Sequence, residues 1–342
     1  MAVTMDEFDR WWNDLTQADL AAIYERTTLK PQFLGNMDLF EEPQGLVGTF
    51  HKATLVQGNV QFLQTSVRGG PGQTRKDTKS RGFGIEIPHV PVVFNVTPSD
   101  LANIDLDIAG SRNAAAADAE GYLADQFQKL RNDAERTWEF HRAWAIQGRL
   151  KDANDGLDVI LNLYDMFAAA PFSLTETTHA MTEANVLEKL EELERLVLEE
   201  LGTDSATQIV LVCGATLFAN LRKSANLKEV LTTDVDKSFA LESYVYRAFQ
   251  VRNITFVEAR GKIGNAAIFP ANEGRVVLPG SGFYNVYDGT PYAIGEAGQR
   301  GREIYVTKER LPHNEGFEIK AQFNRLHICS RPRIAIKVTF TP

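Results

Sequence analysis

The chain has 342 residues, 44% hydrophobic and 24% charged, with a formal net charge of −9 at pH 7. These values are typical of a soluble globular protein long enough for two domains, and they exclude a disordered or collagen-like chain. The acidic balance argues against a general nucleic-acid binder, which is usually basic. It still allows an acidic wall that encloses packed DNA without gripping it.

Neither a membrane protein nor a secreted one is indicated. No apolar run approaches the roughly 20 residues that a spanning helix needs, and the acidic first residues carry no apolar signal segment. The only cysteines, Cys213 and Cys329, are too few for a disulfide framework and lack the clustered histidines of a zinc site. We therefore expect two buried thiols in a protein that is made and kept in a reducing cytoplasm.

The first elements are a helix and an irregular segment. Apolar spacing predicts a helix over residues 5–26, with acidic residues in its first turn. Pro31 ends any continuation, and residues 31–40 are expected to be irregular but anchored by their apolar side chains.

A long polar hairpin is predicted next. Extended residues 48–67 lead to a glycine-rich turn at 68–72, and a return strand runs over 84–94, where prolines confine it to a sheet edge. Such a hairpin cannot bury enough surface alone and must lie on something. Its basic side chains are Arg68, Arg75, Lys76, Lys79 and Arg81. This cluster is either a solvated loop or a docking element for an acidic patch of a neighbouring copy, with the acidic helix 182–201 as one possible partner.

The longest element is an amphipathic helix over residues 111–148. Its apolar positions are spaced by three and four residues: Leu123, Phe127, Leu130, Ala134, Trp138, His141 and Ala145. At 1.5 Å per residue it would extend about 55 Å, which suggests a structural strut. Gly148 and a polar turn at 151–156 end it, and a strand is predicted over 159–164.

The second half alternates helices and strands, which indicates an α/β or α+β arrangement. We predict a helix over 182–201 with a solvated acidic face and Gly202 as its C-cap. The further predicted elements are a strand at 208–213, a helix at 215–223, a helix at 237–250, a strand at 254–259, turns and short strands from 262 to 305, and a C-terminal strand at 333–340 with one buried face.

Motifs for catalysis are weak throughout. Gly82-Phe83-Gly84 and Gly280-Ser281-Gly282 lack the setting of a nucleotide-binding loop. The turn at 152–156 lacks the glutamate of a calcium loop. The six histidines form no i,i+4 pair, and His141 is expected to be packed. The strand–Gly214–helix junction is expected to be ordinary packing rather than an anion site. We therefore predict no catalytic, metal-binding or cofactor-binding residue, and no enzyme.

Taken in order, several stretches resemble one family: the major capsid proteins of tailed phages in the lambda protein E group, which have the Hong Kong 97 (HK97) shell fold. The most specific stretch is Arg136–Gly148 with the Asp-Ala-Asn-Asp-Gly turn after it. The other matching stretches are Pro31–Phe40, Val67–Gly70, Ile87–Val90, Val96–Leu101, Gln208–Gly214, Asn253–Phe256 and Ile328–Arg333.

The resemblance implies an α+β, HK97-like fold with named parts. These are an N-terminal arm (1–46), the extended hairpin or E-loop (47–86), a peripheral domain (87–175) with the spine helix 111–148, an axial domain (176–304), and a return to the peripheral domain with the C-terminal strand (305–342). Contact between subunits would fall to the E-loop tip and its basic leg, namely Arg68, Gly69, Gly70, Arg75, Lys76, Lys79 and Arg81.

The implied function is structural. Pentamers and hexamers of the chain would close an icosahedral virion shell, in the host bacterial cytoplasm, around phage double-stranded DNA that is not bound sequence-specifically. The partners would be a portal, a separate scaffolding protein and a decoration or cement protein. A separate scaffolding protein is implied because the arm begins at once. No membrane would be involved. An encapsulin-like cargo compartment is the nearest alternative. A soluble α/β enzyme using the 208–213 region is another, but it leaves the hairpin unexplained.

Overall fold

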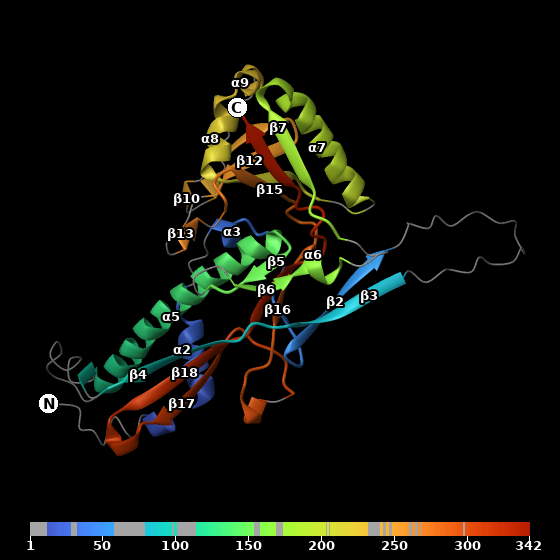
Figure 1. Ribbon diagram of the computed structural model, residues 1–342. Coiled ribbons are helices and arrows are strands. Elements are labelled where there is room, and N and C mark those ends of the chain that lie inside the picture. The colour runs from blue at the N-terminus through green and yellow to red at the C-terminus, as the bar shows by residue number, and fades with distance from the viewer. Residues whose placement is uncertain are drawn as a thin grey trace, which may run out of the picture.

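A computed structural model of the chain shows a helix-covered mixed sheet above a long helix that lies along a smaller sheet, with a two-stranded hairpin leaving one side (Figure 1). The structure describes residues 12–28, 33–57, 79–97, 99–100, 114–153, 158–168, 174–202, 204, 206–231, 240–241, 244–245, 248–259, 262–263, 266–267, 269–296 and 298–342.

The long helix is α5 (Ala114–Ile146), whose 33 residues extend about 50 Å. All seven of its predicted apolar positions are buried. The predicted stop at Gly148 is confirmed and has a steric cause: its φ is +69°, and an added Cβ would lie 2.9 Å from both Tyr164 and Pro332. The predicted first residues, 111–113, lie outside the described ranges.

A three-stranded antiparallel sheet lies against α5 (Figure 1). It is formed by β17 (Tyr305–Arg310), β18 (Phe317–Phe323) and β4 (Val90–Val96), in that order. β4 is an edge strand, as its prolines predicted. The expected single return strand over 84–94 is wrong, because β3 ends at Glu86 and β4 joins a different sheet.

The N-terminal arm packs against this unit through α2 (Gln17–Glu25), whose Leu20, Ile23 and Tyr24 are buried. The prediction of one continuous helix over 5–26 is wrong for the residues that the structure describes. Residues 12–14 are helical, and a break at 15–16 separates them from α2. Thr16 caps the new helix by accepting a hydrogen bond from the Asp19 amide, while the Asp19 carboxylate accepts one from the Thr16 amide. The expected anchors downstream are present, since Phe33 and Leu34 on α3 (Phe33–Asn36) and Leu39 are buried.

The upper lobe is built on a six-stranded mixed sheet. Its order is β11 (Ala248–Val251), β12 (Ile254–Glu258), β8 (Ile209–Cys213), β15 (Glu273–Val277), β20 (Lys337–Thr341) and β7 (Thr178–Thr182). The β12–β8 and β20–β7 pairs are parallel. Helices α7 (Val186–Leu201), α8 (Ala215–Lys223) and α9 (Ala225–Leu231) pack on this sheet (Figure 1). Both cysteines are buried and free, as expected.

Two predictions for this lobe are wrong. The described residues of 237–250 are not helical; they lie in β9 (Ala240–Leu241), β10 (Tyr244–Val245) and β11, which pairs with β12. The C-terminal strand begins at Lys337 rather than 333, and it pairs with β15 and β7 instead of joining the sheet beside α5. The boundaries of the predicted domains stay a prediction.

The acidic helix also differs from its prediction at its first turn. Thr182 ends strand β7, a 3₁₀ turn (Glu183–Asn185) follows, and α7 begins at Val186. Glu183 is not part of a solvated face, because its carboxylate accepts hydrogen bonds from the Ala225 amide (2.8 Å) and the Ser224 hydroxyl (3.0 Å) at the start of α9. Gly202 is the C-cap, as predicted, with φ of +65°.

Glu183→Ala is therefore expected to lower the free energy of unfolding by about 1 kcal/mol, because a capping acceptor is lost at the start of α9. Urea denaturation followed by circular dichroism measures the change. Glu188→Ala, on the exposed side of α7, is the matched control and should change stability by less than about 0.5 kcal/mol. Equal effects of the two variants would contradict the capping role.

A small central sheet joins the two lobes. It consists of β1 (Gln44–Gly45), β16 (Tyr284–Asp288) and β19 (Arg325–Cys329). Beside it, β5 (Arg149–Lys151) pairs with β6 (Val159–Asn162). The strand predicted over 159–164 is two residues shorter, because the Asn162 side chain caps α6 (Leu163–Met166). The remaining short elements are β13 (Lys262–Ile263), β14 (Ala266–Ala267), η2 (Ile294–Glu296) and η3 (Pro312–Asn314).

Candidate functional site

The predicted hairpin is present at its base. β2 (Phe50–Gln57) and β3 (Lys79–Glu86) pair antiparallel without a break, from Phe50 opposite Glu86 to Gln57 opposite Lys79. Of the predicted contact residues, Lys79 and Arg81 lie on β3, opposite Gln57 and Leu55. Arg68, Gly69, Gly70, Arg75 and Lys76 lie outside the described residues. Their contact with a neighbour stays a prediction.

The hairpin base is fixed to the central sheet. Ile85 and Ile87 are buried in a cluster with Leu326 and Ile328 of β19. The His51 ring stacks on Tyr287 of β16, with 3.9 Å between ring centroids. Burial lowers the pKa of His51 below its usual value. The chain thus sets the direction in which the hairpin leaves the body (Figure 1).

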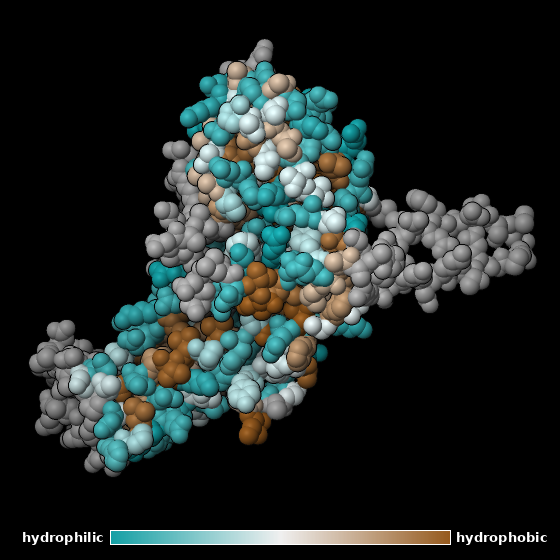
Figure 2. All heavy atoms as spheres, in the orientation of Figure 1, coloured by the Kyte–Doolittle hydropathy of each residue, from teal (hydrophilic) through white to brown (hydrophobic). Residues whose placement is uncertain are grey.

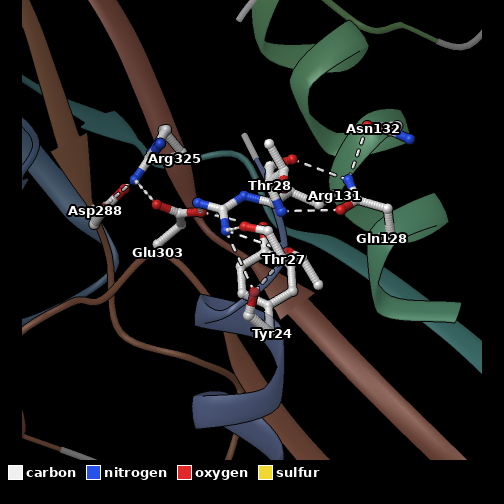
Figure 3. A network of polar contacts seen from close by, with 9 residues as sticks. All are labelled: Tyr24, Thr27, Thr28, Gln128, Arg131, Asn132, Asp288, Glu303 and Arg325. Carbon is white, nitrogen blue, oxygen red and sulfur yellow. Dashed lines mark hydrogen bonds and ion pairs between the residues drawn. The ribbon is translucent and has the colours of Figure 1, made fainter. Parts of the chain in front are cut away.

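A polar clasp holds the end of α2 to α5 (Figure 3). Arg131 of α5 donates hydrogen bonds to the backbone carbonyls of Thr27 (2.8 Å) and Tyr24 (3.3 Å). Gln128 exchanges two hydrogen bonds with the Thr28 backbone, each 2.9 Å long. These contacts bridge about 100 residues of sequence and satisfy the carbonyls at the end of α2.

The same clasp continues into a buried ion pair (Figure 3). The Arg325 guanidinium donates two hydrogen bonds to the Asp288 carboxylate, at 2.7 and 2.9 Å, and lies 3.6 Å from Glu303. It also stacks 4.2 Å from the ring centroid of Trp138 on α5. Burial alone would lower the pKa of Arg325, but the hydrogen bonds and charge of Asp288 outweigh burial and raise it. Glu303 accepts a hydrogen bond from the Tyr24 hydroxyl at 3.1 Å, which ties the ion pair to the arm.

A second clasp holds the next part of the arm. The Glu139 carboxylate of α5 accepts hydrogen bonds from the backbone amides of Leu34 (2.6 Å) and Gly35 (3.2 Å). Burial raises the pKa of Glu139, although both amides and Arg142 oppose that change. Arg142 pairs with Glu135 at 2.5 Å and lies 3.5 Å from Glu139. The arm is therefore bound to the spine helix at two places.

Two buried histidines lie beside this second clasp. His141 of α5 and His327 of β19 are 3% and 1% exposed, with ring centroids 6.4 Å apart. Nδ1 of His141 and both ring nitrogens of His327 make no hydrogen bond within the described part of the chain. Burial lowers the pKa of His141 to about 4. Burial also lowers the pKa of His327 well below its usual value, and the charges of Arg142 and Arg325 add to that effect. The expectation that His141 is packed is confirmed.

A model of the phage major capsid protein E family matches residues 16–340. The chain belongs to this family. It is a capsid shell protein, and the match favours a phage shell over an encapsulin-like cargo compartment. No curated protein sequence matches the chain.

Solved capsid structures cover most of this family member at low identity. The capsid of cyanophage A-1(L) is 13% identical, over 92% of this chain and 94% of that one, with a TM-score of 0.47. The capsid of cyanophage P-SCSP1u is 11% identical over 92% and 90% (TM-score 0.46), and the mature capsid of bacteriophage PhiM1 is 16% identical over 89% and 84% (TM-score 0.45). An anchored hairpin, one long helix and a helix-covered mixed sheet are the elements expected of the HK97-like fold, so the predicted α+β class is confirmed.

The strand–Gly214–helix junction of this capsid protein is closely packed. At the strand–Gly214–helix junction, an added Cβ would lie 2.1 Å from the Pro270 carbonyl, and the Leu217 amide already donates to Ala271. This junction is therefore ordinary packing, as expected. Over the described residues no group of three or more His, Cys, Asp or Glu side chains could hold a metal ion. None of the helices in the described ranges is long and apolar enough to cross a membrane.

Proposed function

We propose that this capsid protein forms pentamers and hexamers that close into an icosahedral shell around phage double-stranded DNA, with each hairpin lying across an adjacent subunit. The observation that carries the proposal is the hairpin base: eight paired residues on each strand, fixed to the central sheet and directed away from the body (Figure 1). In a shell, that direction is toward a neighbouring copy.

The hairpin has the physical features of an element that needs a partner. Within the described ranges, β2 and β3 pair only with each other, so both outer edges have open hydrogen-bonding groups. An isolated two-stranded ribbon is marginally stable in water. Phe50, at the start of β2, is 61% exposed, and Val47 just before it is 64% exposed. Covering these edges and side chains with a second copy would stabilise the ribbon.

In our proposal, opposite charges on the two copies fix how the hairpin is aligned on its neighbour. The hairpin carries Arg68, Arg75, Lys76, Lys79 and Arg81 on a chain of net charge −9. The exposed side of α7 offers carboxylates to a neighbour, among them Glu188, Glu199 and Glu200. Opposite charges on two copies would raise the association rate and disfavour wrong registers.

The same proposal implies further partners of the shell. A separate scaffolding protein would set the curvature, a portal would occupy one vertex, and a decoration or cement protein could cover the outside. Assembly would take place in the cytoplasm of the bacterial host. The acidic chain would face DNA without sequence-specific contacts, because like charge repels the phosphate backbone.

The test is negative-stain electron microscopy with light scattering on the purified protein, expressed with and without its scaffolding partner. Closed shells, or tubes of pentamers and hexamers, are the expected result. A monodisperse monomer or dimer under every condition would overturn the proposal and return attention to the soluble-enzyme alternative.

Charge reversal tests the hairpin contact. The double variant Arg75→Glu/Lys76→Glu is expected to reduce shell yield at least about tenfold in low salt, because two attractive pairs become repulsive at each contact. Sedimentation measures the yield. The unfolding midpoint of the free subunit should stay within about 1 °C, because in this proposal both side chains act on a neighbouring copy.

The control for net charge is Arg222→Glu/Lys223→Glu, which reverses two exposed basic residues at the end of α8. Its shell yield should stay within about twofold of wild type. Intact assembly of the hairpin variant, or equal loss in both variants, would reject the charge contact while leaving shell formation itself untouched.

A further inference from the structure

A second exposed element leaves the body beside the base of the hairpin. The loop between β16 and β17 carries Tyr292, which is 85% exposed, and Ile294, which is 99% exposed. In Figure 2 a hydrophobic tip projects from the lower edge of the molecule, where Figure 1 shows the orange loop that contains η2. No other large apolar side chain in the described ranges is as exposed as these two.

The stem of this loop is fixed by backbone contacts on both sides. The Gly289 amide donates to Asn324 (2.7 Å) and the Thr290 amide donates to Gly48 (3.2 Å). On the returning side, the Gly301 amide donates to Leu46 at 2.9 Å. A Cβ at Gly301 would lie 1.9 Å from the Asp288 carbonyl, so the two legs are packed backbone against backbone.

The tip is also ordered by its own contacts. The Glu296 amide donates to Ala293, and the Gln299 amide donates to Glu296, each at 3.2 Å. Arg302 then ties the turn together by donating to the Glu296 carboxylate (3.1 Å) and the Gln299 side chain (3.2 Å). The loop therefore presents Tyr292 and Ile294 in a preformed arrangement, which reduces the entropy lost when a partner binds.

Single exposed apolar residues are common on protein surfaces, so exposure alone says little. Here two large ones lie two positions apart at the end of a projection. The Tyr292 amide donates to the Gln322 side chain (3.0 Å) and the Tyr292 ring centroid lies 6.4 Å from that of His89, yet both apolar side chains stay almost fully exposed. Tyrosine and large aliphatic side chains at the tip of a preformed projection are the composition of an interface anchor rather than of a solvated loop.

The occupant that fits best is a second copy of this chain. The family to which the chain belongs builds a shell from many copies, and each copy presents the same apolar tip. If the shell left these tips uncovered, it would display a repeated hydrophobic site and invite uncontrolled association. A neighbouring copy is the one partner that is always present at the same stoichiometry.

We propose that the Tyr292–Ile294 tip packs into an apolar surface of a second copy in the shell, as a contact separate from the hairpin. The proposal rests on the proposed shell assembly, but it does not depend on the charge contact of the hairpin.

The first test is chemical protection at Ile294→Cys. The two native cysteines are buried, so a maleimide reports the new thiol alone. In shells made from this variant, labelling is expected to be at least about tenfold slower than in free subunits, because a packed side chain is shielded from reagent. Dissociating the same shells should restore the fast rate. Equal rates in shells and subunits, or protection that requires a second protein, would overturn the proposal.

The second test is assembly of Ile294→Asp. Its side chain is exposed, so the free subunit should fold and unfold like wild type. The protein concentration at which shells form should rise about tenfold or more, because an apolar anchor is replaced by a charge at every copy. Val159→Asp, at a side chain 51% exposed on β6, is the control, with an expected change below about threefold.

The two proposals fail in distinguishable ways. If wild type forms no shell, the proposed function fails. The loop contact is then tested by light scattering, which measures whether Ile294→Asp weakens the self-association that remains. No change in self-association would reject the loop contact. If wild type forms shells and Ile294→Asp forms them at the same concentration, the loop contact alone is wrong.

Discussion

Asp288→Asn is expected to lower the free energy of unfolding of the subunit by about 3–5 kcal/mol. Asp288 and Arg325 are 4% and 7% exposed, and the variant would leave the guanidinium buried with only the more distant Glu303 as a counter-charge. Removing one member of a buried ion pair costs this much because the remaining charge stays desolvated. Guanidinium chloride denaturation of unassembled subunits measures the loss.

Two further variants show whether burial is the cause. Asp133→Asn breaks the exposed pair with Arg136, whose side chains are 69% and 63% exposed, and should cost less than about 0.5 kcal/mol. The double variant Asp288→Leu/Arg325→Met removes both charges and should recover most of the stability, because apolar groups can replace a buried ion pair at little cost. A loss below about 1 kcal/mol for Asp288→Asn would refute the structural role of the pair.

The ion pair matters for assembly because of what it joins. Asp288 and Arg325 lie on adjacent strands of the central sheet, opposite each other in register. The backbone carbonyl of Asp288 also accepts a hydrogen bond from the Leu46 amide (2.8 Å), directly beside the stem of the Tyr292–Ile294 loop. Through Glu303 and Tyr24 the same pair reaches the arm. The hairpin, the arm and the exposed loop thus share one rigid base.

Local signals in the sequence predicted the elements that depend on local chemistry. The 3.6-residue spacing from Leu123 to Ala145 predicted the spine helix and its buried face, and Gly148 predicted the end because its conformation needs glycine. Pro91 predicted an edge strand because proline cannot donate to a ladder. The hairpin was predicted from alternation and turn residues, and its base is present.

Contacts between distant segments could not be predicted in the same way. The C-terminal strand has the expected alternation, but nothing in it indicates that β15 and β7 are its partners. The 237–250 segment has apolar spacing that suits a helix, and pairing of Phe249 with Phe256 across β11 and β12 overrides it. Glu183 was assigned to a solvated face because the helix cap that it provides lies about 40 residues away.

The sequence did not predict the arm clasps or the buried ion pair beside them. Tyr284, Val286 and Asp288 lie on the same side of a strand, as do Arg325, His327 and Cys329, and all six are buried. A carboxylate on one buried face and an arginine on another require partners inside the protein. The sequence shows neither the burial of these two faces nor the pairing of the two charges, and the fold shows both.

The second large expected effect is a loss of stability between pH 6.5 and pH 4 that is caused by the buried histidines. In the unfolded chain His141 takes up a proton near pH 6.5, whereas in the folded chain burial lowers its pKa to about 4. The unfolded state therefore binds more protons in this range, and stability falls as pH falls. The difference corresponds to about 3 kcal/mol for His141, fully developed near pH 4.

His327 adds to this loss in the same direction. Its pKa lies well below the ordinary value, first through burial and then through the charges of Arg142, Arg325 and His141. Glu139 has the opposite effect on stability. Because its pKa is raised in the folded state, the folded chain binds a proton at a higher pH than the unfolded chain does, and this stabilises the fold as the pH falls. Comparing variants with wild type at each pH removes this shared contribution.

His327→Leu isolates the histidine contribution. It replaces a ring without hydrogen-bond partners, packed edge-on against Phe40 with centroids 5.5 Å apart, by an apolar side chain. At pH 7.5 its stability should be equal to that of wild type or higher, and between pH 6.5 and 4 it should lose less. His313→Asn, at an exposed residue with φ of +59° that asparagine tolerates, should follow wild type. Parallel stability–pH curves for His327→Leu and wild type would show that acid acts elsewhere, whereas a flatter curve would place the acid sensitivity at the junction of arm, spine helix and central sheet.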